Sequence, residues 1–122
     1  MEKTILIVED SPQIMKLLRA VLVRSGYAVL EATDGKTGVD LAKENKPDLI
    51  LMDIQLPIVD GLEATRILRA DAKTKDIPII ALTAYAMEED AKKVYDAGCN
   101  EHITKPFEIR ELLNKVTDYL SP

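Results

Sequence analysis

The sequence is poor in the residues that cross-link or anchor proteins. It has one cysteine, Cys99, and one histidine, His102, which excludes an internal disulfide and leaves too few ligands for a Cys/His zinc site. No run approaches the ~18 apolar residues that a membrane span needs. The first residues, Met1-Glu2-Lys3, do not form the basic region of a secretory signal. We therefore expect a cytoplasmic protein that contacts no membrane.

Positive charge is also in the minority. Sixteen Lys and Arg stand against 21 Asp and Glu, for a formal net charge of −5. This balance argues against direct binding of nucleic acid, because a phosphate backbone needs a cationic counter-surface. The 122 residues, 47% of them hydrophobic, suffice for one sizeable core, so we predict a single domain over residues 1–122.

Short aliphatic runs alternate with segments of helical periodicity along the chain. The runs predict five strands, most of them too apolar to have a solvent-facing side: Thr4–Val8, Ala28–Ala32, Leu49–Met52, Ile77–Leu82 and Glu101–Thr104. Apolar spacing predicts five helices, around Ile14–Leu22, Thr37–Glu44, Leu62–Ala70, Met87–Ala97 and Ile109–Val116. Turn or cap residues lie between them at Asp34-Gly35, Pro57, Asp60-Gly61 and Gly98. We assign Met87 and Cys99 to packing.

This alternation predicts an α/β fold in which helices cover both faces of a parallel sheet. Because βαβ crossovers are right-handed, five such units form an open, doubly wound sheet. Ligands of these sheets bind outside the carboxyl ends of the strands, near the point where the strand order reverses. Functional residues are therefore expected directly after the strands.

Three carboxylates stand where two of the predicted strands end. Glu9 and Asp10 follow the first strand, and Asp53 ends the third. Like charges ~4 Å apart repel by several kcal/mol at an intermediate dielectric, so a fold that gathers three needs a compensating cation. Magnesium is the natural candidate, because it binds a few oxygen ligands and keeps several waters. Taken singly, each residue also fits a solvated loop position.

Lys105 follows the last predicted strand and Thr83 follows the fourth. Both side chains should therefore reach the same edge of the sheet. A metal, an ammonium and a hydroxyl donor around an aspartate nucleophile would supply the positioning and charge neutralisation that phosphoryl transfer needs. Taken singly, these two residues also fit ordinary solvent-facing and strand positions. Their joint placement indicates a phosphoryl-transfer site.

Four short motifs, in this order, resemble the response-regulator receiver family. They are Glu9-Asp10, the segment from Asp48 to Pro57 with Asp60-Gly61, Leu82-Thr83-Ala84, and Lys105-Pro106. The resemblance spans nearly the whole chain. The stretch from Asn45 to Pro57 and the segment Ala84-Tyr85-Ala86-Met87 are most similar to stand-alone regulators of the DivK type, and regulators of chemotaxis and of multistep phosphorelays share the architecture.

The resemblance implies a flavodoxin-like (βα)5 fold with strand order 2-1-3-4-5. It implies that Asp53 accepts a phosphoryl group from a histidine kinase or a histidine phosphotransfer protein, for which small phosphodonors could substitute. Asp10 and Asp53 would bind Mg²⁺ or Mn²⁺ directly, Glu9 would help mostly through water, and the Gln55 backbone carbonyl would add a ligand. Such a protein is a phosphoacceptor that dephosphorylates itself, and not a turnover enzyme.

The resemblance also implies a switch. Thr83 would move inward to hydrogen-bond the phosphoryl group, and Lys105, whose bond to Pro106 is often cis in the family, would contact the phosphoryl group or Asp53. Three places before this lysine the family usually has Tyr or Phe, whereas this chain has His102. His102 is either the switch residue or a surface histidine. In the first case its inward form buries a polar ring, so protonation should oppose activation.

Two positions flank the expected chemistry. Gln55 stands two residues after Asp53, and Tyr85 stands two residues after Thr83, where the family controls access of hydrolytic water. We predict that Tyr85 partly covers the acyl phosphate and slows its loss. Exposed loop side chains without such a role are the alternative.

No effector domain follows the last predicted helix, so we expect output by protein–protein contact with a downstream effector. The expected surface is the face of the fourth helix, the last strand and the last helix, to which Thr83 and His102 report. The chain would be a monomer or, when activated, a weak dimer. A receiver excised from a hybrid histidine kinase would have the same sequence features.

Two enzyme and cofactor classes are disfavoured. A phosphatase with an aspartyl-phosphate intermediate needs a second acid/base group and a cap over its substrate, for which the five βα units leave no length. A flavin-binding protein of this architecture is disfavoured because the chain has no Trp, one Phe and no hydroxyl-rich phosphate loop after the first strand.

Overall fold

The computed structural model describes residues 2–84 and 88–121. Within them the chain alternates five strands with five helices: β1 (Thr4–Val8), α1 (Pro12–Arg24), β2 (Ala28–Ala32), α2 (Gly35–Asn45), β3 (Leu49–Asp53), α3 (Gly61–Ala70), β4 (Ile79–Thr83), α4 (Glu88–Ala97), β5 (Glu101–Thr104) and α5 (Ile109–Leu120). All strand pairs are parallel, in the order β2-β1-β3-β4-β5. The predicted doubly wound (βα)5 sheet is confirmed.

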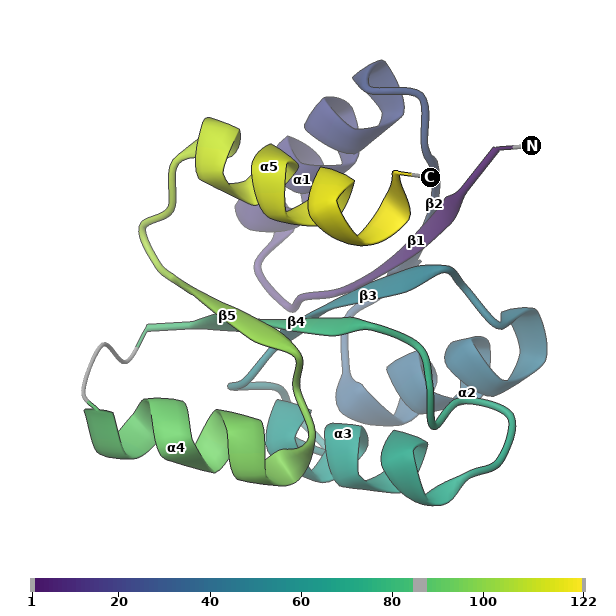
Figure 1. Ribbon diagram of the computed structural model, residues 1–122, viewed down its shortest axis with the longest axis vertical. Helices are drawn as coiled ribbons and strands as arrows, with labels where there is room; N and C mark the ends of the chain where they lie inside the picture. The colour runs from purple at the N-terminus through teal and green to yellow at the C-terminus, as the bar shows by residue number, and fades with distance from the viewer. Residues whose placement is uncertain (1, 85–87, 122) are drawn as a thin grey trace.

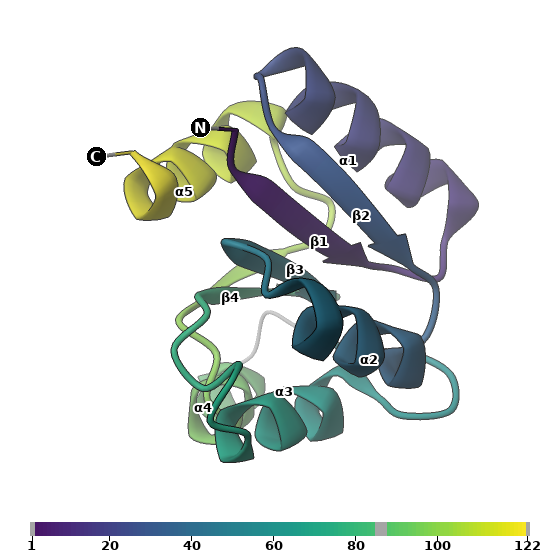
Figure 2. The same ribbon diagram turned by 90° about the vertical axis from the view of Figure 1, so that its right-hand side faces the viewer.

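The sheet is the middle of three layers. Helices α1 and α5 cover one face, and α2, α3 and α4 cover the other, as Figures 1 and 2 show from two sides. Successive residues of a strand point to opposite faces, so each central strand contributes to both cores. Ile5, Ile7, Leu49, Leu51, Ile80 and Leu82 pack toward α1 and α5, whereas Leu6, Val8, Ile50, Met52, Ile79 and Ala81 pack toward α2, α3 and α4.

The central strands β1, β3 and β4 are buried almost throughout, which agrees with their apolar sequences. The edge strands β2 and β5 are only partly buried. They have a neighbouring strand on one side alone, and their polar residues, such as Glu31 and Glu101, belong to these edges.

Three strand boundaries differ from the sequence prediction. β4 begins at Ile79 and not at Ile77, because Pro78 has no N–H to donate to a ladder, although its carbonyl accepts a hydrogen bond from the Ile50 N–H at 2.9 Å. At the other end Thr83 is the last residue of β4 and does not follow it. Asp53 is likewise the last residue of β3, where it pairs with Leu82.

Side-chain caps set the starts of three helices. Ser11, Asp34 and Asp60 each accept a hydrogen bond from the backbone N–H three residues later. Because Asp34 is the cap of α2, this helix begins at Gly35, two residues before the predicted start. Proline at the first position of α1 fits its missing N–H.

The predicted fourth helix is present from Glu88, and Tyr85 and Met87 lie outside the described residues. Cys99 is buried in the core under α2, α3 and α4, as predicted, with its sulfur 3.6 Å from the Thr65 hydroxyl. Gly98 adopts a φ of 113°, a conformation that side chains of L-residues disfavour. None of the described helices is long and apolar enough to cross a membrane.

Candidate functional site

The ends of β1 and β3 bring three carboxylates together. The two strands are neighbours, with Val8 opposite Met52, so the residues that follow meet at one edge of the sheet. Carboxylate oxygens of Glu9, Asp10 and Asp53 lie within 4.8 Å of one another. Glu9 and Asp53 are buried, whereas Asp10 is exposed. The convergence predicted from the sequence is therefore present.

Lys105 reaches this cluster from the loop after β5. Its Nζ donates to Glu9 Oε1 at 2.9 Å and to Asp53 Oδ2 at 3.2 Å. Burial lowers the pKa of Lys105, but the hydrogen bond to Glu9 and the charge of Asp53 outweigh it, so the net pKa is raised. The ammonium is thus held in its charged form. The Lys105-Pro106 bond is cis, as the resemblance implied.

Glu9 is held beneath the surface by two donors. Its Oε2 accepts a hydrogen bond from the Ser11 N–H at 3.0 Å, and its Oε1 accepts the bond from Lys105. Burial raises the pKa of Glu9, and these two hydrogen bonds only partly offset it, so the pKa stays above its ordinary value of 4.5. The neighbouring Asp53 raises it further. A second cation beside these carboxylates would favour the ionised form of Glu9.

Asp53 is fixed by a tight turn. Its Oδ1 accepts a hydrogen bond from the Gln55 N–H at 3.1 Å, while the Gln55 side chain is exposed. Gly61 packs directly under this turn, because a Cβ there would stand 2.0 Å from the Asp53 carbonyl oxygen. Glycine is therefore required for α3 to begin so close to the end of β3.

Thr83 stands beside this group at the end of the neighbouring strand. It is buried, and its carbonyl accepts a hydrogen bond from the Lys105 N–H at 2.7 Å. The backbone thus links the end of β4 to the start of the loop that carries Lys105. The loop with Lys105, the end of β4 and the turn after Asp53 therefore lie together at the carboxyl ends of the strands.

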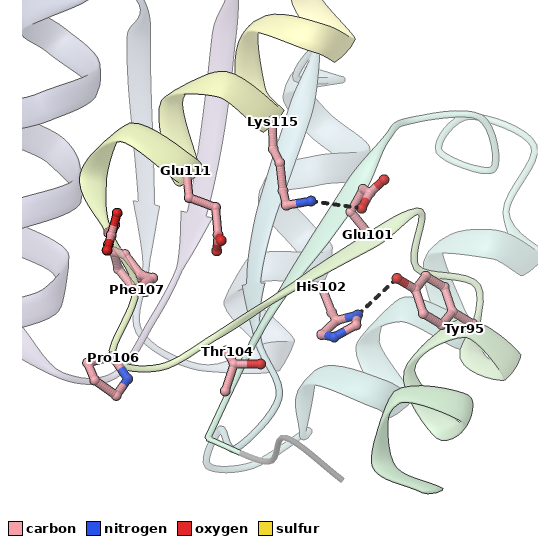
Figure 3. Close-up of a pocket in the computed structure, with 9 residues that line it drawn as sticks. Tyr95, Glu101, His102, Thr104, Pro106, Phe107, Glu111 and Lys115 are labelled. Atoms are coloured by element: carbon pink, nitrogen blue, oxygen red, sulfur yellow. Dashed lines mark hydrogen bonds and ion pairs between the residues drawn. The ribbon is translucent and has the colours of Figure 1, made fainter. Parts of the chain in front are cut away.

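His102 is not part of this edge. It lies in a groove of about 470 Å³ between α4, β5 and α5, where its Nδ1 is 2.9 Å from the Tyr95 hydroxyl (Figure 3). We call this the α4–β5–α5 groove; its lining residues are Tyr95, Glu101, His102, Thr104, Pro106, Phe107, Glu108, Glu111 and Lys115. Sequence reasoning missed the Tyr95 contact, because seven residues and a turn separate the two side chains.

The donor set fits a divalent magnesium-type cation. Three carboxylates face the single ammonium of Lys105 within the cluster that the described residues form, so negative charge remains uncompensated. All three offer hard oxygen ligands, and Asp10 is open to solvent. Such a cation binds few protein oxygens and retains waters, which matches a cluster that is half buried and half exposed.

A comparison with known protein families identifies the family to which this chain belongs. Residues 5–117 match the family described as the response regulator receiver domain. The chain belongs to the response-regulator receiver family. This receiver domain is 43% identical to the polar-differentiation response regulator DivK of Brucella anthropi over 120 residues, which cover 98% of each chain. Receiver domains of this family are signalling switches of two-component and phosphorelay systems, and not turnover enzymes.

Solved structures agree with this family. The receiver domain of the sensor histidine kinase PA1611 from Pseudomonas aeruginosa, which has a magnesium ion in its active-site cleft, superposes with a TM-score of 0.92 at 38% identity over the full length of both chains. The receiver domain of Ssk1 from Saccharomyces cerevisiae, solved with the phosphotransfer protein Ypd1, matches this receiver with a TM-score of 0.91 at 31% identity, covering 97% of this chain and 88% of the other.

Proposed function

We propose that the chain is a phosphorylation-activated switch whose 122 residues form one receiver domain and whose phosphoacceptor is Asp53. The observation that carries this proposal is the position of its carboxylate. Asp53 is the last residue of the central strand β3, and its carboxylate lies next to two other carboxylates and the Lys105 ammonium. One of those carboxylates, Asp10, is exposed, so this cluster borders the solvent. A structural ion pair would not need three acids, since one lysine compensates one charge.

In the proposed reaction an Asp53 carboxylate oxygen bonds to the phosphorus of a phosphohistidine. The phosphorus–nitrogen bond breaks, and the nitrogen keeps its electron pair. Lys105 neutralises charge on the phosphoryl oxygens, and the Thr83 hydroxyl donates a hydrogen bond to one of them. To reset the switch, a water oxygen bonds to the phosphorus, the bond between the phosphorus and the Asp53 oxygen breaks, and inorganic phosphate leaves. This step restores the carboxylate and makes the protein its own phosphatase. Gln55 and Tyr85 would control the access of that water.

The residues proposed to hold Mg²⁺, or Mn²⁺, are Asp10 and Asp53 directly, Glu9 mostly through water, and the backbone carbonyl of Gln55. When bound, the ion supplies neutralisation of the transferred oxygens. The support for this proposal is the oxygen-rich cluster together with the magnesium ion named for the similar receiver of Pseudomonas aeruginosa.

We propose that the phosphodonor, a histidine kinase or a histidine phosphotransfer protein, docks beside Lys105. A largely apolar hollow of about 360 Å³ lies there, lined by Ile14, Leu17, Lys105, Pro106 and Phe107. Leu17 is 45% exposed on α1. An apolar surface next to a reactive carboxylate suits a protein donor more than a small molecule. The Ssk1 receiver's complex with Ypd1 supports a partner of this class.

Output is proposed to pass through the α4–β5–α5 face to a downstream effector, with Thr83 and His102 as the residues that change position. A monomer that dimerises weakly on activation and a cytoplasmic location also remain predictions. Phosphorylation would act by shifting the population between two packings of this face.

The proposal is tested by the intact mass of the protein after incubation with acetyl phosphate, with and without Mg²⁺. The expected result is one Mg²⁺-dependent phosphoryl adduct on the wild type and none on Asp53→Asn. Asp40→Asn is the matched control, because Asp40 is an exposed carboxylate of α2 that pairs with Lys36. A wild type without an adduct, or an adduct that persists in Asp53→Asn, would refute the proposal.

A further inference from the structure

Two aromatic rings connect α4 to β5 in the α4–β5–α5 groove. Tyr95 stands in the last turn of α4, and His102 is the second residue of β5. The hydroxyl of Tyr95 is 2.9 Å from His102 Nδ1, and the rings meet edge to face with centroids 5.5 Å apart. Figure 3 shows both side chains turned toward each other in the α4–β5–α5 groove.

The groove around this pair is acidic. The titratable and charged groups that line it are Tyr95 from α4, Glu101 from β5, Glu108 from the loop, and Glu111 and Lys115 from α5. Lys115 is engaged by Glu101 at 3.2 Å. Lys115 is the one lysine or arginine among these lining residues, against three carboxylates.

The opposite direction is apolar. In the parallel register His102 is opposite Ala81, which belongs to the core under α2, α3 and α4, and Thr83 is opposite Thr104. If Thr83 turns toward a phosphoryl group on Asp53, space opens on this side of β4. The His102 ring can enter it only by leaving the Tyr95 hydroxyl, and a charged ring would lose its solvation there.

We propose that Tyr95 is a positioning residue that holds His102 in the groove, and that the Tyr95–His102 pair opposes activation more strongly in acid. This inference rests on the switch proposed above. The contact persists in both protonation states, because the neutral ring accepts from the Tyr95 O–H and the protonated ring donates to the Tyr95 oxygen. Burial and the charge of Glu101 raise the pKa of Tyr95, so the phenol keeps its proton.

The test is the affinity for beryllofluoride, a phosphoryl mimic, in the presence of Mg²⁺ at about pH 5.8 and about pH 7.8, on either side of the ordinary imidazole value of ~6.5. Tyr95→Phe keeps the ring and removes the hydroxyl, so it should bind the mimic about two- to ten-fold more tightly than the wild type. Tyr119→Phe is the matched control: it removes a hydroxyl that bonds Glu101 at 3.5 Å, and its affinity should match the wild type.

The pH dependence needs a second variant, since the carboxylates around Asp53 also titrate. His102→Asn places an amide near the Nδ1 position but cannot become charged. The loss of affinity between the two pH values should be about three-fold or more greater in the wild type than in His102→Asn. Equal losses would overturn the pH dependence, and unchanged or weaker binding by Tyr95→Phe would overturn the positioning role.

Nitrogen-15 shifts of the His102 ring report the contact without any phosphoryl mimic. They should differ between the wild type and Tyr95→Phe, and identical shifts would overturn the inference. A wild type that shows the ring contact but forms no adduct on Asp53 would instead refute the proposed function, and the coupling of the pair to it.

Discussion

At the scale of single residues, Lys105 contacts two of the carboxylates that are proposed to hold a divalent cation. The Lys105 ammonium bonds both Glu9 and Asp53 and neutralises part of the charge that would otherwise attract Mg²⁺. Lys105→Met should therefore bind Mg²⁺ more tightly, by about ten-fold, or about 1.4 kcal/mol, while its phosphorylation by acetyl phosphate falls. Calorimetric titration with Mg²⁺ measures the first effect.

The control for this prediction is Lys115→Met. Lys115 also pairs with a glutamate, Glu101, but in the α4–β5–α5 groove. Its removal should leave Mg²⁺ affinity unchanged. A Lys105→Met protein with weaker Mg²⁺ binding would mean that the lysine organises the carboxylates more than it competes for them.

The sequence was sufficient to predict which residues gather at this edge, but not which atoms touch. Glu9, Asp10, Asp53, Thr83 and Lys105 were all identified from their positions after or at the end of strands. The direct bond between Lys105 and Glu9 was not predicted. Lys105 follows β5 and Glu9 follows β1, so the lysine side chain must reach past the ends of the two strands that lie between them, β3 and β4. The Tyr95 contact depends likewise on how α4 packs beside β5.

At the scale of elements, the turn from β3 to α3 depends on the absence of a side chain. A Cβ at Gly61 would overlap the Asp53 carbonyl oxygen and approach the Ile54 Cα at 2.7 Å. Gly61→Ala should therefore destabilise the fold by about 2 kcal/mol or more and lower the rate of phosphorylation, since backbone atoms next to Asp53 must shift. Urea denaturation and adduct formation measure the two effects.

Gly26→Ala separates backbone conformation from crowding. Gly26 has a φ of 97°, and no atom of the described residues lies within 4 Å of the position that a Cβ would take. This substitution should cost about 1 kcal/mol from conformation alone and leave phosphorylation intact. Equal phosphorylation rates in both variants would show that the Gly61 contact does not position Asp53.

The N-cap of α2 gives a pH-dependent contribution with a defined sign. Hydrogen bonds from the Thr37 N–H, at 2.7 Å, and the Thr37 hydroxyl hold the pKa of Asp34 below its ordinary value of 3.8. Because the folded pKa is lowered, the carboxylate stabilises the protein above pH 3.8, and this stability is lost as the pH falls through the lowered value. Asp34→Asn caps without titrating.

The measurement is the difference in urea midpoint between the wild type and Asp34→Asn at several pH values. The wild type should lose stability relative to the variant as the pH falls below 3.8. A constant difference would show that the cap bond is as strong for the acid as for the carboxylate. The same cap explains why the predicted start of α2 was two residues too far along the chain. The prediction rested on the spacing of apolar residues, whereas the helix begins directly after its cap.

At the scale of the whole molecule, Arg69 ties together segments that are distant in sequence. Its guanidinium donates to the carbonyls of Gly98 at 2.8 Å and Ile77 at 2.8 Å, and to the Asn100 side chain at 2.7 Å. Asn100 in turn accepts from the N–H of Ile79 at the start of β4. One residue of α3 therefore fixes the entry to both β4 and β5.

Arg69→Met should destabilise the protein by about 2–4 kcal/mol, because it leaves two partly buried carbonyls, those of Gly98 and Ile77, without this donor. Arg66→Met is the matched control on the same helix, since Arg66 forms an exposed pair with Glu63 and should change stability by less than about 1 kcal/mol. Similar denaturation midpoints for the two variants would show that water replaces the Arg69 bonds.

The fold as a whole followed from the sequence, because alternating apolar runs and helical segments leave few topologies. The sequence did not predict how far each strand is exposed to solvent. The edge strand β2 has aliphatic residues like those of the centre, and its lower burial comes from its place in the strand order, whereas three of the four residues of β5 are polar.

The strand order also has a consequence for how the molecule opens. After β3 the chain adds β4 and then β5 outward in one direction, so β5 borders only β4. Its loss would break one ladder and leave the β2-β1-β3-β4 pairings intact. Partial unfolding of β5 with α4 is thus a smaller excursion than any that removes a central strand. The end of the sheet proposed to carry the signal can therefore separate with less disturbance of the remaining ladders than a central strand could.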